Sequence, residues 1–198
     1  MKVGLEPENH EAYHALAALL VQSGDLQGYR LHCARELVRF AGASDPNTAE
    51  RMAKDCLILP PPAAQLPSIT KLADVAVAAG STNKAFAYFQ FAKGLAELRA
   101  GHFGGAVDWL QPVTEASGDI FRTVQAMAAL AIAQNGLKQT DHARVTLTKA
   151  IEFANERFPK KAPLDLEERW NDWYIAQLLM REAEALIQPD STDAQGTK

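Results

Sequence analysis

The sequence predicts an all-α protein. Apolar residues recur about every 3.6 positions along most of the chain, which is the period of an amphipathic helix. The alternation of apolar and polar residues that is typical of a half-buried strand is essentially absent. Glycines and prolines divide the chain into segments of helical length. These observations predict nine helices and no strand.

The first three helices have clear ends. Apolar residues at Tyr13, Leu16, Ala17 and Leu20 form one stripe of a helix that ends at Gly24 and Asp25. A second helix is expected from about Leu26 to Phe40, before the segment AGASDP. Proline is favoured in the first turn of a helix, so Pro46 is expected to open the third. That helix ends at LPPP, because consecutive prolines cannot continue a helix.

Six more helical segments follow the proline-rich segment. In order they are LADVAVAA, FAYFQFAKGLAELRA, GGAVDWLQPVTEA, FRTVQAMAALAIAQ, DHARVTLTKAIEFANERF and ERWNDWYIAQLLMREAEALI. The last is long and amphipathic without interruption. We expect residues 1–7 to be a lead-in, residues 8–188 to form a single domain, and residues 189–198 to be a disordered polar tail.

Composition excludes several classes of protein. A net charge of −4 argues against a nucleic-acid partner, because such proteins need a positive surface. No stretch approaches the 18 or so apolar residues of a membrane span, and no secretory leader is visible. Cys33 and Cys56 lie in apolar helical contexts and are expected to be reduced core residues of a cytoplasmic protein.

Glycines recur at a regular interval. Gly101 and Gly136 each end one predicted helix and precede another, and they are 136 − 101 = 35 residues apart. A period of about 34 residues, with two helices in each unit, is typical of tetratricopeptide repeats (TPRs). We expect Gly101 to turn the chain, and Gly104, Gly105 and Ala106 to let neighbouring helices approach closely.

The sequence resembles the TPR family at the positions that define the repeat. The first-helix pattern is matched by Tyr13, Leu16, Ala17 and Leu20 followed by Gly24-Asp25, and the second-helix pattern by Ala106, Leu110 and Val113 and by Ala143, Leu147 and Ala150. The resemblance implies a right-handed solenoid of about four helix pairs plus a C-terminal capping helix. The chain departs from the pattern at Tyr29, where a small residue is expected, and at the proline-rich insert.

One short string fits a zinc-protease motif. His10-Glu11-Ala12-Tyr13-His14 matches H-E-x-x-H, in which two histidines one turn apart bind zinc and the glutamate acts as a base. Tyr13 already belongs to the repeat pattern, and no third histidine follows at the required spacing. The favoured interpretation is therefore a pair of solvated histidines on the helix surface, with no metal and no other cofactor.

Other catalytic signatures are missing from the sequence. It contains no P-loop, no dinucleotide-binding glycine motif and no nucleophile elbow. His32 directly precedes Cys33, but adjacent residues of a helix point in different directions, so these two do not form a catalytic dyad. We expect that the protein is not an enzyme.

In TPR proteins, the first helices of successive repeats line a concave groove that binds peptides or partner proteins. The resemblance places Glu11, His14, Tyr88, Phe91 and Leu95 on that groove. These positions lack the lysine and asparagine pattern of repeats that clamp a terminal carboxylate. Tyr88 and Phe91 are either core residues or aromatic anchors for a partner.

A narrower resemblance concerns the strings AKDCLILP, LADVAVAA, FAKGLAELRAG and WNDWYIAQLLMREAEAL. They are similar to bacterial kinesin-light-chain homologues and to the TPR region of certain bacterial Ser/Thr protein kinases. The first similarity implies an adaptor that binds or stabilises a bacterial tubulin-like filament. The second implies a regulatory module of a kinase system. A zinc hydrolase that uses His10, Glu11 and His14 is the alternative from another functional class.

Overall fold

The computed structural model describes residues 10–116, 118–159 and 169–188. Over these residues it is all-helical, as predicted, with nine α-helices and one short 3-10 helix, η1 (Ala63–Gln65). The α-helices are α1 (His10–Gln22), α2 (Leu26–Arg39), α3 (Pro46–Leu57), α4 (Leu66–Val77), α5 (Phe86–Arg99), α6 (Phe103–Glu115), α7 (Ile120–Gly136), α8 (Thr140–Arg157) and α9 (Trp170–Ile187). The predicted lead-in and polar tail lie outside the described residues.

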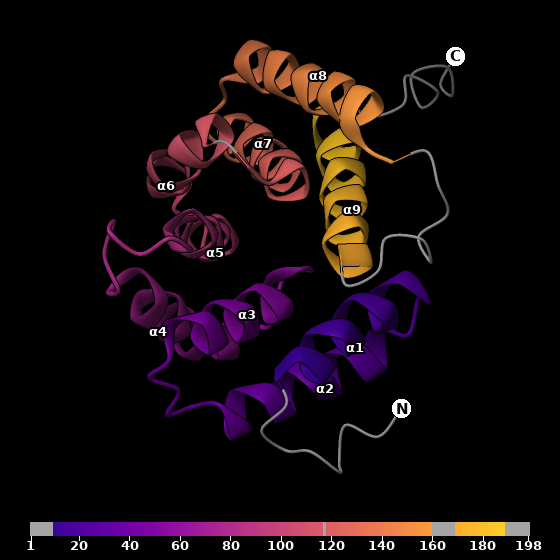
Figure 1. The fold of residues 1–198 in the computed structure, drawn as a ribbon. Coiled ribbons are helices and arrows are strands. Elements are labelled where there is room, and N and C mark those ends of the chain that lie inside the picture. Colours follow the sequence, from indigo (N-terminus) through magenta and orange to yellow (C-terminus); the bar gives the residue numbers. More distant parts are fainter. Residues whose placement is uncertain (1–9, 117, 160–168, 189–198) are drawn as a thin grey trace.

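The helices follow one another in antiparallel pairs and form a repeat-like arrangement around a common centre (Figure 1). Each odd-numbered helix contacts the next odd-numbered one, from α1 through α3, α5 and α7 to α9. Each even-numbered helix packs on its own pair and on the helix that follows it. The odd-numbered helices therefore form an inner layer. Helix α9 also contacts α1, so the first and last described helices are neighbours.

Local sequence accounts for most helix ends. The side chains of Asp25, Asp45 and Asp119 accept hydrogen bonds from the first turns of α2, α3 and α7. Gly101 has a φ of +78°, which confirms the predicted turn between α5 and α6. Gly136 also ends its helix, α7, as predicted, and α8 follows it. The left-handed conformation after α7 is taken by Lys138, with a φ of 63°.

The glycines at which helices pack closely are Gly94 and Gly136, and not the predicted Gly104 and Gly105. A Cβ atom on Gly94 would lie 2.6 Å from Leu110 Cγ, so α5 and α6 meet at this residue. A Cβ on Gly136 would lie 2.6 Å from the ring of Phe103. By contrast, a Cβ on Gly104 would meet open space, and the prediction that Gly104 lets helices approach was wrong. A Cβ on Gly105 would make only ordinary contact, with Glu97 at 3.5 Å.

The small residues of the predicted second-helix pattern are buried. Ala106 on α6 and both Ala143 and Ala150 on α8 have no exposed surface. Leu110 and Leu147, one turn further along these helices, are also fully buried. Alanine at these crossings allows the helix backbones to approach, as the repeat pattern requires.

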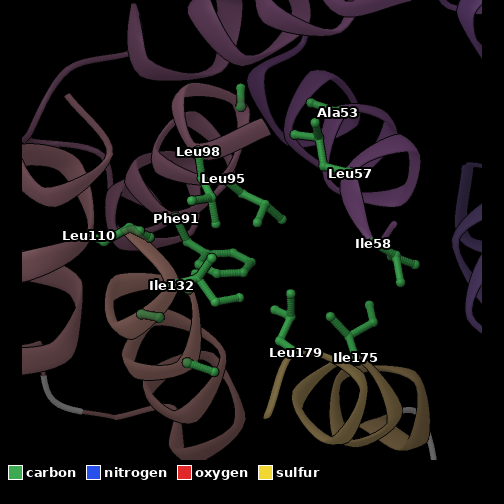
Figure 2. Close-up of a cluster of buried hydrophobic side chains, with 14 of the residues drawn as sticks. Ala53, Leu57, Ile58, Phe91, Leu95, Leu98, Leu110, Ile132, Ile175 and Leu179 are labelled. Carbon is green, nitrogen blue, oxygen red and sulfur yellow. The ribbon is translucent and has the colours of Figure 1, made fainter. Parts of the chain in front are cut away.

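Large apolar side chains fill the centre of the arrangement. Figure 2 shows Leu57 and Ile58 at the end of α3 on one side of this centre, with Phe91 and Leu95 of α5, Ile132 of α7, and Ile175 and Leu179 of α9 around it. All of these residues are buried. Segments that lie far apart in the sequence therefore share one core, which fixes the position of α9 relative to α3 and α5.

Arg99 joins three helices at the edge of this core. Its guanidinium donates hydrogen bonds to the carbonyl oxygens of Leu57 (3.1 Å) and Ile58 (2.9 Å), which have no helical partner at the end of α3. It also pairs with the carboxylate of Glu182 on α9, with Nη2 to Oε2 at 2.8 Å. The side chain of Arg99 on α5 thus provides hydrogen bonds to the carbonyl groups at the end of α3 and also binds α9.

No helix within the described ranges is both long and apolar enough to cross a membrane. Cys33 and Cys56 are both buried, which confirms the prediction that they are core residues, and the structure has no disulfide between them.

Candidate functional site

A hollow of about 650 Å³ opens on the inner layer of helices. Residues of α1, α3 and α5 form one part of its wall, and residues at the N-terminal ends of α7 and α9 form the other. Charged and polar side chains supply much of this wall, and the aromatic residues Tyr88, Phe89 and Trp170 also line it.

Asp119 organises the wall on the side of α7. Its carboxylate accepts hydrogen bonds from the backbone N–H groups of Phe121 (2.9 Å) and Arg122 (3.1 Å), and so caps α7. The same carboxylate accepts a hydrogen bond from the Tyr88 hydroxyl at 2.5 Å and pairs with Arg169 at 2.5 Å. A single helix cap therefore fixes the position of the tyrosine that faces the hollow.

The electrostatics of this group follow from its contacts. Burial alone would raise the pKa of Asp119, but hydrogen bonds from Tyr88 and Arg169 hold it below its usual value. Burial, together with the neighbouring carboxylate, raises the pKa of Tyr88 to about 12. The guanidinium of Arg122 lies 4.5 Å from the centre of the Tyr88 ring. Tyr88 is therefore neutral at neutral pH, and its hydroxyl donates a hydrogen bond to Asp119.

Arg51 on α3 faces the opposite rim. It forms an ion pair with Glu11 on α1, and its Nη1 lies 2.9 Å from His10 Nδ1. Both Glu11 and Arg51 line the hollow. Because Glu11 is exposed, the ion pair contributes little to the stability of the fold. Arg51 and Glu11 can therefore separate and bind a ligand instead of each other.

A buried ion cluster forms the floor of the hollow. Lys54 Nζ lies 3.3 Å from Glu50 Oε1 on its own helix and 3.4 Å from Asp172 Oδ1 on α9. Gln125 on α7 donates a hydrogen bond to the Asp172 carbonyl oxygen at 2.8 Å. Burial would lower the pKa of Lys54, but Asp172 and Glu50 hold it above its ordinary value, so the ammonium stays charged. The cluster ties α3, α7 and α9 together beneath the hollow.

His14 lies beside this cluster. Its Nδ1 is 2.5 Å from Asp55 Oδ1, and both side chains are buried. Burial would lower the pKa of His14, but the charge of Asp55 and the hydrogen bond to it raise the pKa above the ordinary value. The imidazole therefore carries a proton more readily in the folded protein than in the unfolded chain.

A second polar cluster lies on the other side of α3, between α2 and α3. His32 Nε2 is 3.0 Å from Glu36 Oε1, and the Cys56 thiol lies 3.5 Å from Glu36 Oε2. Tyr29, which departs from the repeat pattern, is buried here and donates a hydrogen bond to the Asp55 carbonyl oxygen at 2.7 Å. The large side chain at this position therefore bridges α2 and α3, where a small residue would leave a gap.

The structure separates the predicted groove residues into two sets. Glu11, His14 and Tyr88 line the hollow, although the side chain of His14 is only 4% exposed. Phe91 and Leu95 do not line it: they are 1% and 0% exposed and belong to the central core. Of the two alternatives for the aromatic residues, the structure assigns Phe91 to the core, because its face of α5 turns toward α7 and α9 (Figure 2).

The residues of the H-E-x-x-H string each have a partner elsewhere. His14 turns inward to Asp55 on α3, so the expectation of two surface histidines was wrong for this residue. Glu11 and His10 both contact the Arg51 guanidinium, whose positive charge opposes a divalent cation at that position. Among the described residues, the side chains that lie close enough to share a metal ion are Cys33, Glu36 and Cys56.

Sequence reasoning missed most of the polar residues of the hollow. Glu50 and Lys54 have the i,i+4 spacing of a helical ion pair, which is a visible local signal. Nothing local indicates that Asp172, which is 118 residues from Lys54, completes the cluster. The same is true of Arg169 and its partner Asp119.

Comparisons with protein-family models, with curated proteins and with solved structures returned no match.

Proposed function

We propose that the protein is a non-catalytic adaptor of the TPR type, which binds a peptide segment of another protein in the hollow of its inner helices. The observation that carries the proposal is that α1, α3 and α5, the first helices of successive pairs, line one continuous hollow with Tyr88 in its wall. Grooves on the inner face of helical repeats are where such proteins bind their partners.

The size and the chemistry of the hollow support a peptide ligand. A volume of about 650 Å³ lies within the range of a small-ligand pocket, enough for a few side chains of an extended segment. The wall offers a fixed aromatic hydroxyl at Tyr88 and the exposed pair of Arg51 with Glu11. Charges of both signs on the wall suit backbone groups and mixed side chains better than a strongly acidic or strongly basic ligand.

The pairing of the ionisable groups favours binding over catalysis. Asp119 is held by Arg169 and Tyr88, and Lys54 by Glu50 and Asp172. A general acid or base needs a pKa near the working pH and access to the substrate. In the wall of the hollow, the pKa of Asp119 is lowered and that of Tyr88 is raised, which moves both away from neutrality.

The identity of the partner comes from the sequence resemblance. Similarity to bacterial kinesin-light-chain homologues makes a bacterial tubulin-like filament the first partner to test. Similarity to the TPR regions of bacterial kinases makes a kinase system the second.

The test measures partner binding and stability on the same variants. Binding is followed by co-sedimentation with bacterial tubulin filaments and by titration of any partner identified by affinity purification. We expect Tyr88→Ala to weaken binding by about 2 kcal/mol, because interface energy concentrates in aromatic anchors. Phe153→Ala on α8 is the matched control, because Phe153 is also half-buried but lies away from the hollow. Phe91→Ala should instead lower the free energy of unfolding by about 3–5 kcal/mol.

Equal binding by wild type, Tyr88→Ala and Arg51→Ala would contradict a binding site in the hollow. Tyr88→Phe keeps the ring and removes only the hydroxyl, and so separates the contribution of the hydrogen bond from that of the aromatic surface. Kinase-dependent binding without filament binding would favour the second partner class.

A further inference from the structure

The geometry points to a zinc site that is independent of the hollow: Cys33, Glu36 and Cys56 bind one Zn²⁺ between α2 and α3. The three ligands come from two helices. Cys33 and Glu36 are separated by three positions on α2, so their side chains share one face of that helix, and Cys56 faces them from α3. Pairs of ligands on facing helices are a common way to build a metal site in helical proteins.

The ligand atoms already lie close together. The two sulfur atoms and a carboxylate oxygen of Glu36 are all within 4.8 Å of one another, and all three residues are buried. A zinc ion about 2.3 Å from sulfur and about 2.1 Å from oxygen requires ligand atoms somewhat under 4 Å apart. Zinc binding therefore requires rotations of the three side chains that bring their ligand atoms closer together.

The hydrogen bonding of Glu36 leaves a place for a cation. The carboxylate is 0% exposed, and Glu36 Oε1 accepts no hydrogen bond. His32 Nε2 is 3.0 Å from this oxygen, but it lies equally close, at 3.0 Å, to the carbonyl oxygen of Tyr13. One N–H group can donate fully to only one of them, and the hydrogen-bond geometry favours Tyr13. The nearby imidazole of His32 offsets only part of the cost of burying this carboxylate oxygen without a hydrogen bond, and a metal ion would satisfy it.

A small cavity lies beside the two cysteine ligands. It has a volume of about 40 Å³ and is lined by both cysteines, by Tyr29, and by the prolines between α3 and α4. This volume is sufficient for a water molecule. Its outer wall includes the exposed residues Leu26 and Arg30, which gives a short path from solvent. Three protein ligands and one water molecule complete the tetrahedral coordination that zinc prefers.

The choice of zinc follows from the ligand types. Two cysteine sulfurs select a soft or borderline metal ion over Mg²⁺ or Ca²⁺, which prefer all-oxygen sites. The site also has a structural use. Helix α2 packs less extensively on α3 than α4 packs on α5 or α6 packs on α7. A zinc ion would join α2 to α3 where direct packing is least extensive.

The experiment uses the full chain, reduced and stripped of metal with a chelator. Zn²⁺ is titrated in competition with a chromophoric chelator, and bound metal is counted by elemental mass spectrometry. We expect one ion per chain and a higher melting temperature with zinc than without it. Cys56→Ser and Glu36→Gln should each raise the zinc Kd by about 100-fold or more, since even residues that only support metal ligands change affinity by about 10- to 100-fold. Glu152→Gln, at an exposed position on α8, is the control: it removes a carboxylate outside the proposed site and should leave the Kd unchanged.

Two further measurements keep the inference testable if a ligand variant fails to fold. Co²⁺ bound to the wild-type chain should give a thiolate-to-cobalt charge-transfer band, which requires sulfur ligands. His14→Ala should retain the metal, whereas a site at the H-E-x-x-H string would lose it. Failure of the reduced wild-type chain to bind Zn²⁺, binding without the charge-transfer band, or unchanged affinity in both Cys56→Ser and Glu36→Gln would each overturn the inference.

Discussion

Helices α1 to α3 bury ionisable side chains, whereas the residues that α6 and α8 bury are alanine, leucine and valine. His14, Glu50, Lys54 and Asp55 are all buried in the first region. In the second, the buried residues of α6 and α8 are those of the repeat pattern, with Ala106, Ala143 and Ala150 at the crossings. The two regions use the same helix-pair arrangement but hold it together by different interactions.

Because the two regions are held together differently, different mutations should destabilise each of them. An interface of small apolar residues depends on volume, because an added methyl group must displace a neighbour. An interface of buried ions depends on pairing, because removal of one partner leaves the other charge buried and uncompensated. The polar region also forms the floor and one wall of the proposed binding hollow, so its stability and its function involve the same residues.

Replacing Lys54 should destabilise the polar region more than any other substitution considered below. Lys54→Met should lower the free energy of unfolding by about 3–5 kcal/mol, because it leaves Glu50 buried without its cation and removes the partner of the half-buried Asp172. The measurement is urea denaturation at neutral pH. Lys149→Met on the exposed face of α8 is the control and should change the value by no more than about 0.5 kcal/mol. Equal effects of the two substitutions would show that the buried cluster does not stabilise the fold.

A single methyl group should break the apolar packing between α5 and α6. Gly94→Ala places a Cβ 2.6 Å from Leu110 Cγ, and should lower the free energy of unfolding by about 1–3 kcal/mol. Gly104→Ala is the matched control on the neighbouring helix, where the new Cβ meets open space. It should be neutral or raise stability by up to about 1 kcal/mol, since alanine favours helix more than glycine does. If Gly94→Ala were as stable as Gly104→Ala, the two helices would not meet at this residue.

The pH dependence of the free energy of unfolding should also reveal the polar region from α1 to α3. We expect this effect to be smaller than those of Lys54→Met and Gly94→Ala. Because Asp55 raises the folded-state pKa of His14, protonation of this histidine stabilises the folded state. Its contribution is complete below the unfolded-state pKa of about 6.5 and is lost as the pH rises through the higher folded-state value. His14→Gln should therefore remove part of the stability that the wild type loses as the pH rises above about 6.5.

Denaturant unfolding at several pH values measures this contribution. His142→Gln, at an exposed position on α8, should leave the pH profile of the wild type unchanged. A profile that is the same for His14→Gln and the wild type would mean that His14 does not gain a proton on folding.

The helices could be predicted from the sequence because their signals are local. The stripe that begins at Tyr13, the turn at Gly101 and the prolines from Pro60 all act on neighbouring residues, and they gave the order and the approximate ends of the helices. Burial of Ala106 was also predictable, because the spacing of small and large residues within one helix identifies a crossing.

The predicted site was less accurate, because its residues meet only through tertiary packing. The aromatic residues of α5 point to several sides of the helix, and periodicity alone could not show that Tyr88 faces the hollow while Phe91 faces α7 and α9. The close approach at Gly94 depends on the position of Leu110, which lies on the next helix. The ion pair of Lys54 with Asp172 depends on how α9 returns to α3.

The contact between α1 and α9 also affects how the molecule unfolds. In a linear array of repeats, each unit touches only its neighbours, so unfolding can start at either terminus and spread one unit at a time. Here the first described helix supports the last, and Lys54 and Arg99 connect α9 to α3 and α5 as well. If α9 detaches, the surfaces of α1 and α7 that pack against it become exposed to solvent at the same time. This coupling favours a single cooperative transition over progressive fraying from one end.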